Sequence, residues 1–125
     1  MTDSVERLYE GVIRARQGDP TKSRTARLLR SGRAKMAKKL AEEAVEVVID
    51  AMNGSREAVV KESADLIYNL VVLWVSSGVQ PREVWKEMER RERLFGIAEK
   101  LTKEALDDPR RKVVALEPRR LRKRR

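Results

Sequence analysis

Apolar positions recur with the 3.6-residue period of α-helices along most of this chain of 125 residues, and no stretch alternates like a β-strand. A first helix is expected to begin at Asp3, which with Glu6 forms a capping box, and to end at residues 18–20, Gly-Asp-Pro. A connector over residues 21–31 follows, with a short helical turn at about 26–30. The pattern predicts an all-α fold.

Two long helices are predicted at the centre of the chain. The first runs from about Arg33 to Met52 and stops at Asn53-Gly54, where the glycine can adopt a left-handed C-cap. Ser55 caps the second, which continues to about Ser77. A further helix opens at Pro81. Its apolar positions continue past a weak point at Gly96, and they are Val84, Trp85, Met88, Leu94, Ile97 and Leu101.

Acidic residues interrupt both central helices in narrow strips. At 100° per residue, the polar positions of the first helix fall in an arc of about 100°. They are Lys39, Glu42, Glu43, Glu46 and Asp50. On the second helix Glu62, Asp65 and Asn69 form a stripe at i, i+3 and i+7. Like charges at these spacings repel, and carboxylates are rarely buried without a partner. The expected partner is Mg²⁺, which prefers hard oxygen ligands, with Mn²⁺ as a substitute.

A solvated helix face with ion pairs four residues apart is the alternative explanation of these strips. Lys39 and Glu43 have the spacing of such a pair. The explanation fits the second helix poorly, because its nearest base, Lys61, lies off the stripe. The metal site is therefore the favoured interpretation.

The chain contains no Cys and no His. Zinc sites of the Cys/His type, thiol nucleophiles and Ser-His-Asp triads are therefore excluded. A general base must be Glu, Asp or a metal-bound hydroxide. No secretory pattern opens the sequence, and the longest apolar run, near residues 66–75, is far short of the about 20 residues that span a bilayer. We expect a soluble cytoplasmic protein with no membrane segment.

The net charge of +9 is concentrated at the C-terminus. Residues 109–125 hold nine Lys or Arg and one Glu, a net of +8, which leaves +1 for residues 1–108. We expect one domain over residues 1–106 and a flexible basic tail over residues 107–125. The tail has the charge to bind nucleic acid without sequence preference. A solubilising extension is the favoured interpretation of the tail.

Three segments carry a resemblance to a known family: KKLAEEAVEVVIDAMNG, EAVVKESADLIYNLVVLW and SRTARLL. They resemble the phosphoribosyl-ATP pyrophosphohydrolases of histidine biosynthesis, within the MazG-like superfamily of all-α nucleotide pyrophosphohydrolases, over about residues 4–93. This chain has Ala41 where the family commonly has Gly, and Asn69 where it commonly has His. The superfamily pattern E-E-x-x-E then E-x-x-D implies five catalytic, metal-binding carboxylates. They are Glu42, Glu43, Glu46, Glu62 and Asp65.

The resemblance implies Mg²⁺-dependent hydrolysis of phosphoribosyl-ATP to phosphoribosyl-AMP and pyrophosphate, the second step of histidine biosynthesis. A house-cleaning nucleoside triphosphate pyrophosphohydrolase of the MazG-like type would use the same five acids. The SRTARLL and DLIYNLVVLW segments favour the first activity. A nonenzymatic helical protein that binds nucleic acid through its tail is disfavoured, because no basic stripe appears on the helices.

Several residues near the acidic strips are candidates for binding the nucleotide substrate. Lys22, Arg24 and Arg33 precede or open the first acidic helix and have the charge to contact phosphates. Lys39 has two open roles, to reach a phosphate oxygen or to balance the carboxylates. Asn69 has two as well, to orient a ligand or to bond a base or sugar edge.

The two central helices are apolar over more surface than one small subunit can cover. A C2 dimer, or a higher homo-oligomer, would complete a larger MazG-like helical bundle, and members of the resembled family are dimers. Trp74 and Val75 are candidates for the interface, unless Trp74 packs under Trp85 in the same subunit. The apolar residues that a monomer is expected to expose are Val45, Ile49, Ile67, Val71 and Trp74.

Overall fold

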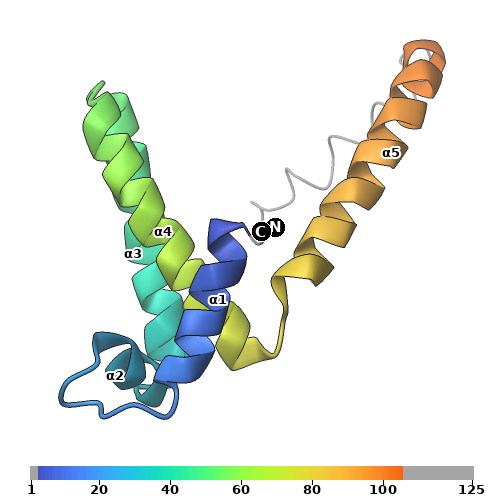
Figure 1. Cartoon of the computed structure of the whole chain (residues 1–125). Coiled ribbons are helices and arrows are strands. Elements are labelled where there is room, and N and C mark those ends of the chain that lie inside the picture. The colour runs from blue at the N-terminus through green and yellow to red at the C-terminus, as the bar shows by residue number, and fades with distance from the viewer. Residues whose placement is uncertain (1–2, 106–125) are drawn as a thin grey trace, which may run out of the picture. The chain divides into compact units, whose positions relative to one another are not determined.

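The structure, a computed structural model, describes residues 3–105, with side chains as far as residue 96. This part of the chain is helical and contains no strand, so the all-α prediction is confirmed. The predicted flexible tail lies outside the described residues. Figure 1 labels the helices, which are α1 (Ser4–Ala15), α2 (Arg24–Arg30), α3 (Arg33–Met52), α4 (Arg56–Ser77) and α5 (Pro81–Ala105). None of them has both the length and the hydropathy that crossing a bilayer requires.

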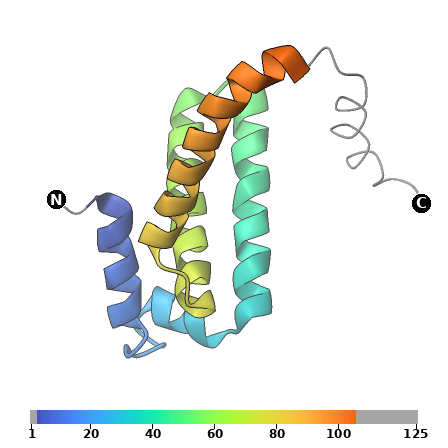
Figure 2. The same cartoon turned by 90° about the vertical axis from the view of Figure 1, so that its right-hand side faces the viewer.

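The chain divides into two units between Val84 and Trp85. The first unit holds α1 to α4 and the first turn of α5. In it α3 and α4 form a helical hairpin and lie side by side, as Figures 1 and 2 show. Helices α1 and α2 pack near the end of the hairpin where α3 begins and α4 finishes. The opposite half of the hairpin therefore receives little cover from the rest of this unit.

Side-chain caps explain where the helices begin. The Asp3 carboxylate accepts the Glu6 N–H at 2.7 Å, and the Ser55 hydroxyl accepts the Ala58 N–H at 3.3 Å, as predicted. The short turn expected at 26–30 is a full helix that begins earlier, at Arg24. The reason is a cap that the sequence analysis missed, in which Ser23 Oγ accepts the N–H of Ala26 at 3.0 Å.

The turn between α3 and α4 reverses the chain within three residues. Gly54 has a φ of 77°, the left-handed conformation predicted for it, which few residues other than glycine adopt readily. Because the turn is so short, the two acidic helices run antiparallel and pack against each other.

The hydrophobic core lies where α1 and α2 meet the hairpin. Its buried members are Val12, Met36, Val71, Val72 and Val75. This corrects two expectations, because Val71 and Val75 belong to the core of the subunit and are not available to an interface between subunits. Trp74 is partly buried and packs against the core. Helical periodicity identifies an apolar arc but not which neighbour covers it. The alternative packing of Trp74 under Trp85 stays a prediction.

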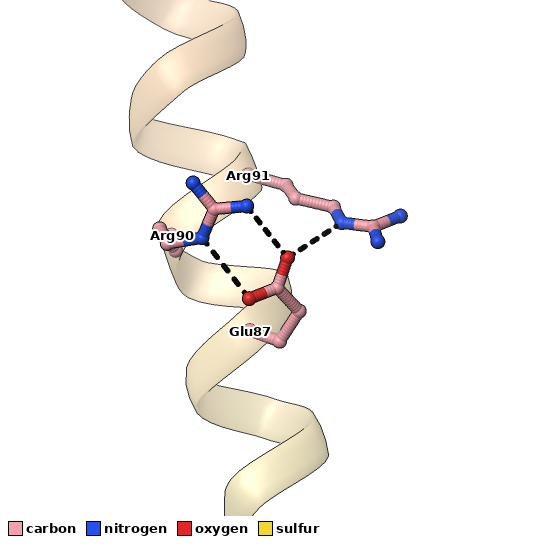
Figure 3. A network of polar contacts seen from close by, with 3 residues as sticks. All are labelled: Glu87, Arg90 and Arg91. Atoms are coloured by element: carbon pink, nitrogen blue, oxygen red, sulfur yellow. Dashed lines mark hydrogen bonds and ion pairs between the residues drawn. The ribbon is translucent and has the colours of Figure 1, made fainter.

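The second unit begins at Trp85 and contains the rest of α5. The helix continues past Gly96, as predicted, and ends at Ala105. Figure 3 shows Glu87 accepting hydrogen bonds from Arg90 at 2.8 and 3.0 Å and from Arg91 at 2.9 Å. The bonds from Arg90, and then the bond from Arg91, lower the pKa of Glu87 to about 2. These pairs at i+3 and i+4 stabilise an exposed stretch of helix.

Candidate active site

Helices α3 and α4 bring carboxylates from the two strips together. Glu43, Glu62 and Asp65 each offer an oxygen within 4.8 Å of the others, and so do Glu46, Asp50 and Glu62. Glu62 belongs to both groups and lies where they join. We call these five residues the acidic cluster.

The crowding of negative charge in the acidic cluster perturbs Glu62. A hydrogen bond with the Glu43 side chain, followed by desolvation and by the charges of Glu43, Asp65 and Glu46, raises the pKa of Glu62 to about 7. Near neutral pH, Glu62 therefore stays protonated in a substantial fraction of the molecules. A proton on Glu62 relieves the repulsion among the carboxylates. A bound cation would relieve the same repulsion in place of the proton.

Glu42 stands apart from the acidic cluster, although the motif predicted it as a ligand. Its side chain is 52% exposed, and its ion-pair partner is Lys38, 4.0 Å away. Successive helical residues point about 100° apart, so Glu42 is turned aside when Glu43 faces α4. Asp50 joins the cluster in its place. The signal for Asp50 was the spacing i, i+4, i+7 and i+11 of Lys39, Glu43, Glu46 and Asp50 along one face.

Lys39 joins the acidic cluster to a second feature, a small cavity lined largely by cations. Its Nζ lies 3.6 Å from Glu43 Oε2, in the i,i+4 pair that the sequence suggested. Lys39 also lines a cavity of about 210 Å³, which we call the basic pocket. The other lining residues are Arg24, Arg27, Leu28, Ser31 and Lys35.

The basic pocket contains some of the predicted substrate-binding residues and not others. Arg24 and Lys39 line it. Arg33 instead donates from Nη2 to the Ser76 carbonyl at 3.4 Å, near the end of α4. Lys22 lies in the turn before α2, where its N–H donates to the Asp19 carbonyl at 2.9 Å, and it does not line the pocket.

Two cations of the basic pocket, Arg27 and Lys35, were missed by the sequence analysis. The sequence predicts a helical turn at about 26–30, which contains Arg27 but leaves Arg24 outside it, so the two arginines are not placed on a common face. On helices, Arg24 and Arg27 are three residues apart and Lys35 and Lys39 are four apart, so each pair shares a face. That spacing is the signal that could have found them.

Asn69 is 2% exposed and therefore poorly placed to touch a substrate. Its Nδ2 donates to the main-chain carbonyl of Asp65 at 2.8 Å, and its Oδ1 has no hydrogen-bond partner among the described residues. Of the two roles considered for it, this contact supports the positioning of a ligand residue, because it fastens the turn of α4 that carries Asp65. Burial argues against contact with a base or sugar edge.

The fold and the site define an all-α protein whose paired helices combine clustered carboxylates with an adjoining cationic pocket, the features expected of a helical nucleotide pyrophosphohydrolase. Residues 5–92 match the family model described as phosphoribosyl-ATP pyrophosphohydrolase, nearly the span over which the resemblance was seen. The chain belongs to this family.

Relatives named phosphoribosyl-ATP pyrophosphatase match the chain over most or all of its length. A protein of Rhodopseudomonas palustris named phosphoribosyl-ATP pyrophosphatase 2 is 60% identical over 131 aligned residues, covering 100% of both chains. A protein of Bradyrhizobium diazoefficiens with the same name is 61% identical, covering 99% of each. The phosphoribosyl-ATP pyrophosphatase of Azospirillum brasilense is 50% identical, covering 77% of this chain and 86% of its own.

Proposed function

We propose that this chain hydrolyses phosphoribosyl-ATP to phosphoribosyl-AMP and pyrophosphate, the second step of histidine biosynthesis. Its family and the names of its relatives support this activity. The structural observation that carries it is the 3.6 Å contact between Lys39 and Glu43, because it makes the acidic cluster and the basic pocket adjoin. A polyphosphate can then lie with its reacting phosphorus at the cluster and its anionic end at the cations. We place the reaction in the cytoplasm.

Mg²⁺ fits the acidic cluster as the cofactor. The cluster offers only hard carboxylate oxygens, and its negative charges are close enough for Glu62 to retain a proton. Glu43, Glu62 and Asp65 would hold one ion, and Glu46 and Asp50 would hold a second together with Glu62. When bound, Mg²⁺ neutralises charge on phosphate oxygens and lowers the pKa of a coordinated water. Mn²⁺ has similar preferences and would substitute for it.

The side chains of the site divide the remaining work. A carboxylate of the acidic cluster accepts the proton of the attacking water, since the chain has neither His nor Cys to do so. The water oxygen forms a bond to phosphorus, and the bond from that phosphorus to the bridging oxygen breaks. Lys39 lies where the negative charge of the departing pyrophosphate grows and stabilises it.

A second copy of the chain is proposed to cover the exposed half of the hairpin. Within the first unit this half shows a series of large apolar side chains to solvent, more than monomers usually expose together. A homodimer or a higher homo-oligomer would bury them and complete the helical bundle. These side chains are Val45, Val48, Ile49, Met52, Val60 and Ile67.

A substrate panel tests the activity. Release of pyrophosphate is measured from phosphoribosyl-ATP, ATP and the deoxynucleoside triphosphates, each with Mg²⁺ and with EDTA. We expect phosphoribosyl-ATP to have the highest kcat/KM and EDTA to abolish turnover. Glu62→Gln should lose most activity. Glu57→Gln, on the same helix but outside the cluster, should keep it. Faster turnover of the deoxynucleotides would instead support a house-cleaning pyrophosphohydrolase.

A further inference from the structure

We infer that the basic pocket binds the pyrophosphate end of the substrate, its β and γ phosphates, and that Arg27 and Lys35 are phosphate-binding residues. The identity of the substrate rests on the proposed function. Whatever the substrate is, the structure around α2 and the start of α3 favours an anion in this pocket.

The charge of the lining is the first reason. Four of the six residues around the cavity are cations, two from each helix, and none is acidic. Within the described part of the chain only one of the four, Lys39, has an ion-pair partner. Like charges gathered around one small cavity repel one another. A multivalent anion removes that repulsion and converts it into attraction.

The second reason is that the arginines are already held in place. The Arg24 guanidinium lies over the Tyr68 ring, 5.1 Å from its centre, and the Tyr68 hydroxyl is 2.6 Å from Thr25 Oγ1. Arg27 donates from Nη1 to the Pro20 carbonyl at 2.9 Å. Because a guanidinium has five N–H donors, this single bond leaves most of them for phosphate oxygens. Such preorganisation lowers the entropic cost of binding.

The third reason is the local start of α3. Its N-cap is Gly32, which supplies no side-chain hydrogen bond, and its first turn has no acidic residue. The free N–H groups and the positive end of the helix dipole therefore meet further positive charge, including that of Lys35. Ser31 and Lys35 of the pocket lining flank this end. An anion in the pocket would offset this unfavourable arrangement.

Size and position select the pyrophosphate end. A volume of about 210 Å³ is below the about 300–1,000 Å³ of pockets that enclose drug-sized ligands, so the cavity suits part of a nucleotide. The substrate has two anionic ends, its triphosphate and the 5′-phosphate of the phosphoribosyl group. Lys39 lines the pocket and contacts Glu43 of the acidic cluster. The pocket therefore lies next to the bond that is cleaved. The β and γ phosphates, which leave as pyrophosphate, are also next to that bond, so they are the part of the substrate that the pocket would bind.

Binding of inorganic pyrophosphate to the full-length protein tests the inference without turnover. Calorimetry in EDTA at fixed ionic strength removes any contribution of divalent cations. Arg27→Gln and Lys35→Gln should each weaken pyrophosphate binding by about tenfold, the usual scale for one charge-assisted contact. Arg30→Gln and Lys38→Gln, on the same two helices but outside the lining, should change it less than threefold. Melting temperatures check that every variant is folded.

Ribose 5-phosphate is the second probe and represents the other end of the substrate. We expect it to bind weakly and equally to the wild-type protein and to all four variants. The assignment is overturned if the two pocket variants lose ribose 5-phosphate binding and keep pyrophosphate binding. It is also overturned if the wild-type protein fails to bind pyrophosphate. A protein that binds pyrophosphate in this pocket but does not hydrolyse phosphoribosyl-ATP would refute the proposed activity and leave the anion pocket standing.

Discussion

Glu43 on α3 and Glu62 on α4 share a hydrogen bond between their carboxyl groups, and this bond is the largest cause of the raised pKa of Glu62. Such a bond requires a proton on one partner. When the proton leaves, the two carboxylates repel each other and the other acids of the cluster. Both protonation and cation binding at the α3–α4 interface should therefore change the stability of the folded protein.

Without divalent cations, the free energy of unfolding should fall as the pH rises through the range in which Glu62 titrates. The pKa of Glu62 is about 7 in the folded protein and 4.5 when unperturbed, so the folded state binds the extra proton between these values. Its stabilising effect is present below about pH 4.5 and lost as the pH rises through about 7. Melting temperatures in EDTA between pH 4.5 and 8 measure it, and the difference between Glu62→Gln and wild type should shift in favour of the variant as the pH rises. A difference that stays constant would contradict the assignment.

Mg²⁺ or Mn²⁺ should raise the melting temperature at pH 7.5, since an ion that binds only the folded acidic cluster stabilises it by mass action. At a concentration 100 times the Kd the gain is about 2.7 kcal/mol. Asp65→Asn should abolish most of this gain. The exposed residue Glu42 provides the comparison, because Glu42→Gln should retain most of it. If both variants lost the same part of the gain in melting temperature, Glu42 would be a metal ligand after all.

Asp50 tests whether both groups of the acidic cluster take part in hydrolysis. Asp50→Asn should lower Mg²⁺-dependent kcat/KM by tenfold or more, because it replaces one of the three carboxylates in the group that contains Glu46 by a neutral amide. Glu46→Gln should remove most activity and leave a folded protein. Circular dichroism with steady-state kinetics makes the measurement. Normal turnover in Asp50→Asn would confine the chemistry to Glu43, Glu62 and Asp65.

Much of this architecture could be read from local sequence signals. The cap at Asp3, the left-handed Gly54 and the opening proline of α5 are decided by residues near in sequence, so these three boundaries were predicted well. The sequence did not predict which side chains face a helix that is distant in sequence. Glu42 and Asp50 lie on the same broad polar arc, and only the position of α4 selects between them.

The same limit applies to the apolar residues and to the basic pocket. Val71 and Ile67 lie on one apolar helix and are one turn apart, yet Val71 is fully buried in the core and Ile67 is 43% exposed. The packing of α1 on α4 determines which of the two residues is buried, and the type of residue does not. The two arginines of the basic pocket share a helix face only because α2 begins at Arg24, before the start of the predicted turn.

Disruption of the exposed half of the hairpin should dissociate the proposed oligomer. Ile67→Asp places a charge on this surface, where burial in an interface would be strongly unfavourable. Ile13 in α1 is a matched control, because it is 41% exposed and lies outside the hairpin. Sedimentation velocity at micromolar concentration should show at least a dimer for the wild-type protein and for Ile13→Asp, and a smaller species for Ile67→Asp. Burial is worth about 25 cal/mol per Å² of apolar surface, so an interface of this kind should persist at that concentration.

Activity should fall together with assembly, since the facing acidic strips depend on two helices that the second copy supports. A wild-type protein that is a monomer at every concentration and fully active would rule the oligomer out.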